Sequence, residues 1–222
     1  MGLALQLKNW IELTEKVCDT ARRRVLLEET VPNDEKLFSL FETHTQLYRR
    51  GKAGRQNQFG RLVVVFEDGA GFISHYHLMN RDAVDSEVIV EQTRAAQKKH
   101  GGAIETASFD RGFYSPENAE QLATILDEAC LPPRHPTQYA EHLANAGVKF
   151  HQLRRRHPGV ESAIGALQSG NGMKRCRDQG ELGFERYLGL AILGRNIHTL
   201  GKLLLAREQP KSAAAKSRRQ VA

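Results

Sequence analysis

The sequence predicts a mixed α/β fold, with helices covering a sheet and a long helix at the N-terminus. Two observations lead to this prediction. Two β-rich runs lie side by side in the first half of the chain, and after them helical patterns alternate with a further strand-like run. Adjacent strands followed by strand–helix alternation are typical of a mixed sheet flanked by helices. The chain has 222 residues, which is enough for one domain or slightly more.

The N-terminal helix is predicted from its apolar periodicity. Apolar residues recur at intervals of three and four, at Leu3, Leu7, Trp10, Leu13, Val17, Ala21 and Val25. This spacing places them on one face of a helix. A proline at position 32 breaks the pattern, and we therefore assign residues 1–30 to a separate helical segment.

A β-hairpin is the clearest prediction in the chain. Residues 62–79 contain two β-rich runs that flank a turn of the Asp-Gly type at 67–71. The first run is apolar on both faces, which predicts a buried, central strand. Before the hairpin, residues 37–44 are ambiguous between strand and helix, and residues 48–60 are expected to form a basic loop.

The rest of the main domain, assigned to residues 31–207, is expected to consist of helices and one more strand. The segments are a helix at 84–99, a strand at 103–109, a helix from Pro116 to about residue 129, and helices at 139–146, 160–167 and 184–207. The final segment, 208–222, is basic and of low complexity, which predicts a disordered tail.

The composition narrows the class of protein and its partners. Lysine and arginine number 32 against 26 acidic residues, a formal net charge of +6. Such a balance is compatible with a phosphate-bearing partner without establishing one. No apolar run reaches the roughly 18 residues that a membrane span requires. The three cysteines fit no zinc or disulfide spacing. We therefore predict a cytoplasmic protein without a membrane segment.

Asp110 is the first candidate site residue. It follows the strand predicted at 103–109, and ligands of α/β sheets bind at the carboxyl ends of strands. The alternative is a turn or helix-capping role. Ser115 stands directly before Pro116 and fits the cap of the next helix better, which leaves Asp110 as a candidate for function.

Glu161 is the second candidate, in the first turn of the helix predicted at 160–167. An acid there also stabilises the helix dipole, and this structural explanation is about as good as the functional one. Brought together, Asp110 and Glu161 would repel each other unless a divalent cation lay between them. Paired carboxylates that hold Mg²⁺ are typical of phosphoryl-transfer sites.

Basic residues near the two acids predict contact with a phosphate backbone, although charged runs more often form a solvated surface. The candidate DNA-binding residues are Arg111, Arg154, Arg155, Arg156, Lys174 and Arg175. His75 and His77 share a strand face, but no third metal ligand follows nearby, and we interpret them and Asp68 as structural residues.

Three segments together resemble a known family. FDRGFYSPEN (109–118), RRRHPGVESAIGAL (154–167) and GFERYLGLAILGRNIHTLGKLL (183–204) resemble the catalytic half of bacterial insertion-sequence transposases of the DDE superfamily, closest to the ISNCY type. Residues 31–54 and 59–73 are similar to the middle region of that group. The resemblance covers roughly residues 20–205.

The resemblance implies a ribonuclease-H-like fold and cleavage and transfer of DNA strands at transposon ends. It implies two Mg²⁺ (or Mn²⁺) ions held by two Asp and one Glu. Asp110 matches the second Asp and Glu161 the terminal Glu.

The first Asp of the family and the strand that carries it have no match in this chain. The resemblance therefore implies an incomplete sheet that lacks its first strand, with residues 1–30 as the tail of a helical insertion. We expect the chain to be inactive alone, and to pair with an upstream transposase half or with itself. The alternative is a non-catalytic, basic DNA-binding or dimerising fragment that modulates a full-length transposase. A small-molecule phosphohydrolase is disfavoured, because no glycine-rich phosphate loop is present.

Overall fold

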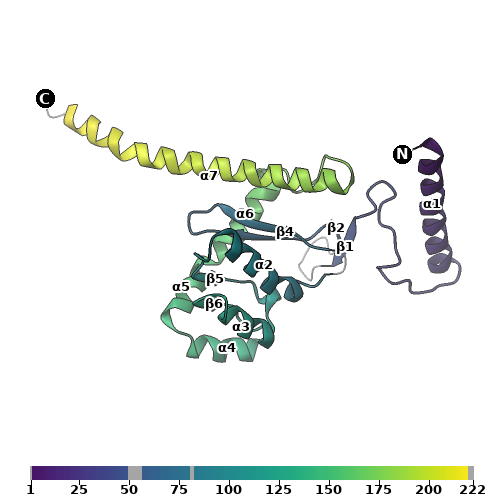
Figure 1. Cartoon of the computed structure of the whole chain (residues 1–222), viewed down its shortest axis with the longest axis horizontal. Coiled ribbons are helices and arrows are strands. Elements are labelled where there is room, and N and C mark those ends of the chain that lie inside the picture. The colour runs from purple at the N-terminus through teal and green to yellow at the C-terminus, as the bar shows by residue number, and fades with distance from the viewer. Residues whose placement is uncertain (1, 50–56, 81–82, 220–222) are drawn as a thin grey trace. The chain divides into compact units, whose positions relative to one another are not determined.

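The computed structural model describes residues 2–49, 57–80 and 83–219 (Figure 1). Its helices and strands confirm a mixed α/β protein with a long N-terminal helix. The elements, in chain order, are α1 (Leu3–Val25), β1 (Gln46–Arg49), β2 (Asn57–Gly60), β3 (Val63–Glu67), β4 (Ile73–Leu78), α2 (Asp85–Lys99), β5 (Thr106–Ser108), the 3₁₀ turn η1 (Arg111–Phe113), α3 (Pro116–Ala123), β6 (Glu128–Cys130), α4 (Pro136–Asn145), α5 (Val148–Arg156), α6 (Pro158–Ser169) and α7 (Gly180–Arg219).

The chain divides into two compact units. The first comprises residues 1–63, 78–82 and 178–185, and the second comprises residues 64–77, 83–177 and 186–222. Neither unit is one continuous stretch of chain, because the chain passes between them several times. The domain boundaries expected at residues 30 and 207 remain predictions.

In the first unit, α1 confirms the helix predicted from the apolar periodicity. None of its residues is buried, and the Trp10 ring lies 5.3 Å from that of Phe41. Its last turn is fixed by Arg23, which donates to Glu29 at 2.8 Å and to Glu35 at 2.7 Å. These two exposed ion pairs hold the segment that follows the helix against the helix end.

The basic loop predicted at 48–60 is partly wrong. Residues 46–49 pair with residues 57–60 as an antiparallel ladder, with Leu47 opposite Phe59 and Tyr48 opposite Gln58. These aromatic and aliphatic residues favour strands, and they stand at the two ends of the basic segment. Residues 50–56 lie outside the described part of the chain. The ambiguous segment 37–44 forms neither helix nor strand.

The hairpin of β3 and β4 confirms the predicted turn. One carboxylate oxygen of Asp68 accepts hydrogen bonds from the backbone N–H of Ala70 and of Phe72, both at 2.9 Å. Gly71 has a φ of 87°, which glycine adopts without strain. Asp68 thus organises the turn, as the Asp-Gly pattern predicts.

The prediction that the first of these strands is central is wrong for the described residues. There, the strands form three separate two-stranded sheets, and β3 pairs with β4 alone. Of β3, only Val64 is fully buried. At the start of β4 the side chain of Asn196, in α7, accepts from the Ile73 N–H at 2.8 Å and donates to the Ile73 carbonyl at 3.0 Å. A side-chain amide therefore occupies backbone groups that a further strand would use.

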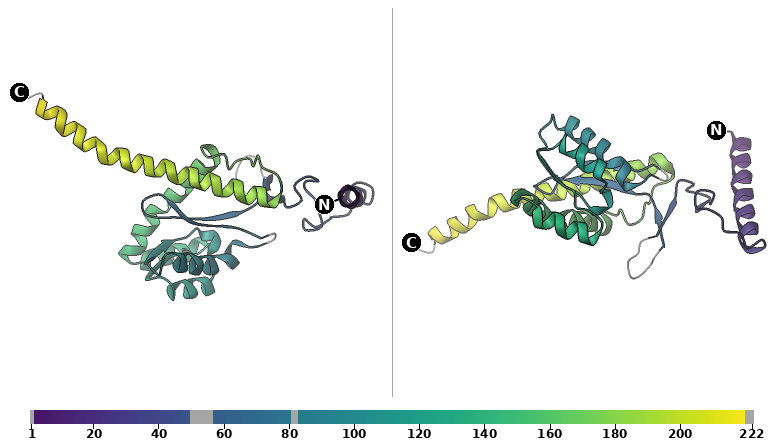
Figure 2. Two further views of the ribbon diagram at one scale, coloured as in Figure 1. Left: turned by 45° about the horizontal axis from the view of Figure 1, so that its top comes forward. Right: turned by 90° about the horizontal axis from the view of Figure 1, so that it is seen from below.

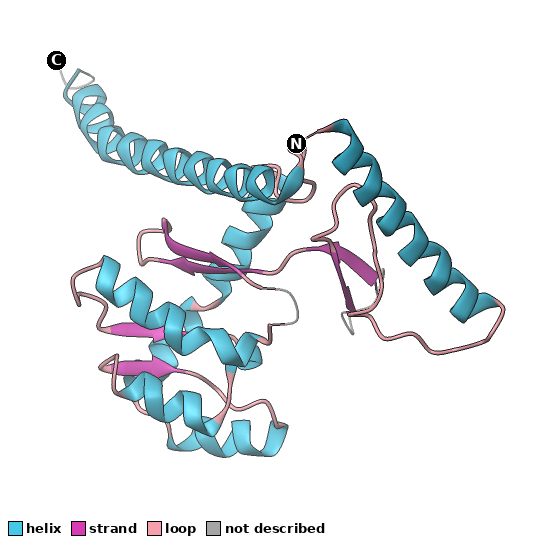
Figure 3. Ribbon diagram, turned by 45° about the vertical axis from the view of Figure 1, so that its right-hand side comes forward, coloured by secondary structure: helices cyan, strands magenta, loops and turns pink. Residues whose placement is uncertain are grey.

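The core of the second unit lies between the parallel pair of β5 and β6 and the helices α2, α3 and α5 (Figure 3). The most deeply buried side chains there are Ile89, Thr93, Ala96, Leu122 and Cys130. Parallel strands need a crossover connection, and η1 with α3 supplies it.

The helix predicted from Pro116 to about residue 129 is too long. It ends at Ala123, and residues 128–130 form β6 instead, in parallel register with residues 106–108. The Phe109 N–H extends the ladder by donating to the Cys130 carbonyl at 2.9 Å. The pattern of Glu128–Cys130 has no strand character of its own, so pairing with β5 decides its conformation.

The last elements are all helical. The helix α5 covers a segment for which no element was predicted, and α4 and α6 begin two or three residues earlier than expected. The helix α7 continues to Arg219, so the disorder expected from residue 208 is not found for 208–219. Three consecutive alanines followed by Lys216 favour a helix there. No helix of the described residues is both long and apolar enough to cross a membrane.

Candidate functional site

Asp110 lies where β5 ends, beyond the buried Phe109. Its exposed carboxylate accepts from the backbone N–H of Arg111 at 2.6 Å and caps the turn η1. Ser115 caps α3 by accepting from the Asn118 N–H at 3.0 Å, as predicted. We expected Ser115 to cap the next helix and Asp110 to have no capping role. The first expectation is confirmed, whereas the second is wrong, because Asp110 caps η1. The short turn η1 lies between the strand and the predicted helix, and Asp110 is its cap.

Glu161 lies in the first turn of α6, with its side chain exposed. The helices α5 and α6 follow each other with only His157 between them, and Pro158 opens α6. Proline lacks an N–H and is favoured in the first turn of a helix, so it ends α5 and starts α6. This junction determines where α6, and with it Glu161, lies relative to β5.

His157, at that junction, connects the start of α6 to the end of β5. Its Nδ1 lies 3.1 Å from the Ser108 hydroxyl at the end of β5. Burial and, next, the positive charge of Arg154 lower the pKa of His157, while the charges of Asp110 and Glu161 act in the opposite direction. His157 thus joins the end of β5, which is followed by Asp110, to the start of α6, which carries Glu161. The sequence interpretation had treated His157 only as part of a helix lead-in.

A third acid, Glu67, lies near the start of α6. A Cβ built on Gly159 would lie 3.8 Å from Oε2 of Glu67, and Nη2 of Arg195 lies 3.8 Å from its Oε1. Burial raises the pKa of the Glu67 carboxyl, Arg195 lowers it, and the neighbouring Asp68 raises it. Sequence reasoning had assigned Glu67 only to the hairpin turn, because its approach to Gly159 depends on the packing of α6.

The described residues contain no group of three or more His, Cys, Asp and Glu side chains arranged to hold a metal ion. Asp110 and Glu161 thus remain a pair of candidate ligands on two different elements. Both are exposed oxygen donors, which is the type of ligand that Mg²⁺ binds.

The predicted basic residues fall into two groups. Arg154, Arg155 and Arg156 form the last turn of α5, immediately before His157. Arg154 is half-buried, and its Nη1 finds no hydrogen-bond partner among the described atoms, whereas the other two are exposed. Lys174 and Arg175 are exposed in the loop after α6, and the rest of α6, about 12 Å of helix, separates them from Glu161.

Arg111 follows Asp110 directly and is exposed. Its guanidinium lies 5.4 Å from the centre of the Tyr139 ring, and its carbonyl accepts from Nε of Arg134 at 3.1 Å. The cation–π contact orients Arg111 toward α4. A second cation, Arg134, therefore lies beside the turn that holds Asp110, and no pattern in the sequence had selected it.

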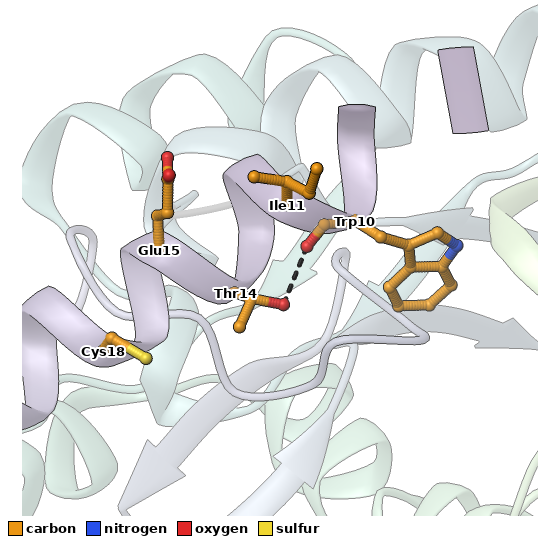
Figure 4. Close-up of a pocket in the computed structure, with 5 residues that line it drawn as sticks. All are labelled: Trp10, Ile11, Thr14, Glu15 and Cys18. Atoms are coloured by element: carbon orange, nitrogen blue, oxygen red, sulfur yellow. Dashed lines mark hydrogen bonds between the residues drawn. The ribbon is translucent and has the colours of Figure 1, made fainter. Parts of the chain in front are cut away.

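A surface hollow along α1, which belongs to the first unit, has no group of charged side chains like the one near Asp110. It is lined by Trp10, Ile11, Thr14, Glu15 and Cys18, all from α1 (Figure 4). The one hydrogen bond among them joins the Thr14 hydroxyl to the Trp10 carbonyl at 2.7 Å, within the helix itself.

No protein-family model, curated protein or solved structure matches this chain.

Proposed function

We propose that the chain takes part in Mg²⁺-dependent cleavage and transfer of DNA strands, as the C-terminal part of a DDE-type transposase catalytic domain of ribonuclease-H-like fold. The observation that favours this function most is the 3.1 Å contact between Ser108 and His157, which holds the end of β5, next to Asp110, against the start of the helix that carries Glu161. These are the two acids that the resemblance assigns to metal binding. We place this activity in the cytoplasm, on transposon DNA.

The exposed carboxylates of Asp110 and Glu161 would hold Mg²⁺ or Mn²⁺. A divalent cation bound there would activate a water molecule or a DNA 3′-hydroxyl and stabilise the leaving oxygen. Ser108 and His157 would orient the end of β5 relative to α6, because their side chains meet at 3.1 Å. Arg155 and Arg156, which are exposed in the last turn of α5, would bind the phosphate backbone.

The chain alone is expected neither to cut nor to join DNA, because the resemblance calls for a third carboxylate. Within the described residues β3 and β5 each pair with one strand only. A strand that carries the missing Asp would add to one of these edges, supplied by an upstream half of the transposase. Loss of one ligand from a two-metal site usually abolishes the reaction, because the two metals act as a unit.

The first experiment maps the cation site without requiring activity. The full chain is loaded with Fe²⁺ in place of Mg²⁺, and ascorbate with peroxide generates radicals that cut the backbone near bound iron. Cleavage is expected near residues 110 and 157–161, and it should disappear in Asp110→Asn and in Glu161→Gln. The exposed Asp127→Asn serves as control and should retain it. Cleavage elsewhere, or cleavage that survives both substitutions, would reject Asp110 and Glu161 as ligands.

The second experiment measures nicking of supercoiled and terminal-repeat DNA with Mg²⁺ and with Mn²⁺. No nicking by the chain alone is expected. Nicking that vanishes in both Asp110→Asn and Glu161→Gln would refute the predicted inactivity, yet it would support the metal site.

The alternative is a non-catalytic DNA-binding fragment that modulates a full-length transposase. The net charge of +6 and the exposed Arg155, Arg156, Lys174 and Arg175 favour it. Binding of duplex DNA that weakens steeply with salt, together with no iron-directed cleavage at residues 110 and 161, would support this alternative over the first function.

A further inference from the structure

Two exposed arginines lie beyond the carboxyl ends of the parallel strands β5 and β6. Arg111 is the first residue of η1, which follows β5, and Arg134 lies between β6 and α4. The elements from α2 to α5 belong to one unit and lie together in every view (Figures 1 and 2). Ligands of α/β sheets bind beyond the carboxyl ends of the strands. The two side chains therefore lie where a ligand of these strands would bind.

Each guanidinium is held by a contact of its own. Arg134 donates from Nε to the Arg111 carbonyl at 3.1 Å and from Nη2 to the Gly112 carbonyl. The Arg111 guanidinium lies 5.4 Å from the centre of the Tyr139 ring, which is a cation–π contact. Side chains that are already ordered lose little conformational freedom when a ligand binds, so both arginines are preorganised for binding.

The charges around this turn do not favour a simple anion. Neither arginine takes part in an ion pair of the described residues. Two acids nevertheless lie on the same turn. The Asp110 carboxylate accepts from the Arg111 N–H at 2.6 Å, and Oδ2 of Asp85 would lie 3.3 Å from a Cβ on Gly112. Two cations beside two acids leave no net charge, so inorganic phosphate gains little from charge alone.

The open face of Arg111 is suited to a nucleobase. A guanidinium is planar and stacks on aromatic rings. One face of this group is directed at Tyr139, and the other is open because Arg111 is exposed. Nucleobases that have left the helix stack on aromatic rings and on guanidinium planes. Within a duplex, the neighbouring base pairs cover both faces of each base, so this position suits an unpaired base.

We propose that Arg111, Arg134 and Tyr139 bind an unpaired nucleotide of a DNA strand. Its base stacks on Arg111, and its phosphate accepts from Arg134, which retains Nη1 as a donor. That the nucleotide belongs to DNA rests on the proposed function, whereas the stack requires neither Mg²⁺ nor its candidate ligands. Because Arg111 follows Asp110 directly, the bound nucleotide would lie beside the position where the strand is cut or joined.

The test compares binding of the full chain to a short duplex with a single-stranded overhang and to the same duplex with the overhang filled in. Fluorescence anisotropy is read in EDTA, so that no divalent cation takes part. The overhang duplex should bind about tenfold more tightly, the contribution of roughly one stacked base. A deoxynucleoside monophosphate at the same concentration as the duplex should not displace it. Displacement would identify a site for free nucleotides and overturn the proposal.

Matched substitutions separate stacking from charge and from folding. Arg111→Lys keeps the positive charge without the planar group, and Tyr139→Leu removes the ring. Either one should reduce the preference for the overhang to about twofold or less, whereas Tyr139→Phe keeps the ring and should retain the preference. Arg94→Lys is the control, because Arg94 is an exposed arginine of α2 that donates to Gln121 at 3.2 Å. This variant should keep the wild-type preference.

A further variant examines the phosphate contact. Arg134→Gln should weaken binding of the overhang duplex about tenfold, with a shallower dependence on salt. Unchanged binding by Arg134→Gln, equal affinity of the wild type for both duplexes, or a preference that survives Arg111→Lys and Tyr139→Leu would overturn this proposal alone. No binding of either duplex at low salt would overturn the proposed function as well.

Discussion

Replacing Asn118 by Asp should destabilise the second unit strongly, although the two side chains have nearly the same shape. The Asn118 side chain is 8% exposed. Its Nδ2 donates to the Ser86 carbonyl at 2.7 Å and to the Phe113 carbonyl at 2.8 Å. One amide therefore joins three elements, α3, α2 and η1, around the loop that holds Asp110.

The magnitude follows from those two hydrogen bonds. An ionised Asp donates nothing, so both bonds are lost, at about 0.5–1.5 kcal/mol each, and two buried carbonyls lose their donor. The carboxylate would also face two carbonyl oxygens, which repel it. We expect the free energy of unfolding to fall by about 2–4 kcal/mol at pH 7.5.

Urea denaturation followed by far-UV circular dichroism measures this loss. The control is Asn145→Asp, the same exchange at an exposed position at the end of α4, which should change stability by less than about 0.5 kcal/mol. Burial near the carbonyls raises the pKa of the new carboxyl, so the folded state binds more protons. The loss should therefore shrink as the pH falls toward about 4. A loss below about 1 kcal/mol at pH 7.5, with an unchanged urea dependence, would refute the role assigned to Asn118.

Three further predictions concern single positions. Ser115→Ala removes the α3 cap that accepts from the Asn118 N–H, and it should cost about 1 kcal/mol in thermal or urea unfolding, whereas Ser115→Asp should retain most of the stability. Gly172→Ala should destabilise by about 1–3 kcal/mol, since its φ is 80° and a Cβ would lie 2.7 Å from the Tyr187 hydroxyl; a neutral outcome would show that the loop rearranges freely. The pKa of His157 is lowered in the folded state, so near and below the ordinary histidine pKa of about 6.5 the unfolded state binds more protons than the folded state. The free energy of unfolding should therefore decline as the pH falls from about 7 toward 5. His157→Gln should reduce that decline, measured by urea unfolding across this pH range.

Features set by neighbouring residues could be predicted from the sequence. The turn of the β3–β4 hairpin follows from Asp68 and Gly71, because the side chain that forms the turn and the glycine that permits it are adjacent in the chain. The start of α3 follows in the same way from Ser115 and Pro116. The existence of α1 was also predictable, because its apolar spacing is regular, although the helix ends at Val25 and not at residue 30.

Features set by distant contacts could not be predicted. The strand Glu128–Cys130 was taken for the end of a helix, because only its pairing with β5 makes it extended. The pairing of His157 with Ser108 depends on the angle at which α5 meets α6, which no local pattern encodes. That Asp110 and Glu161 lie together and bind a metal remains a prediction.

The two hydrogen bonds between Asn196 and Ile73 have a consequence for the orientation of α7. A helix held only by apolar side chains can rotate about its axis or slide along a strand at little cost, because such contacts have no preferred direction. An amide that both accepts from and donates to one backbone residue fixes the angular phase of the helix as well as its axial position. Since every position of a helix is offset by a constant angle from the next, fixing the phase at Asn196 determines which side chains face outward along residues 186–208 of α7. A single half-buried side chain therefore decides which surface this helix presents to the surroundings.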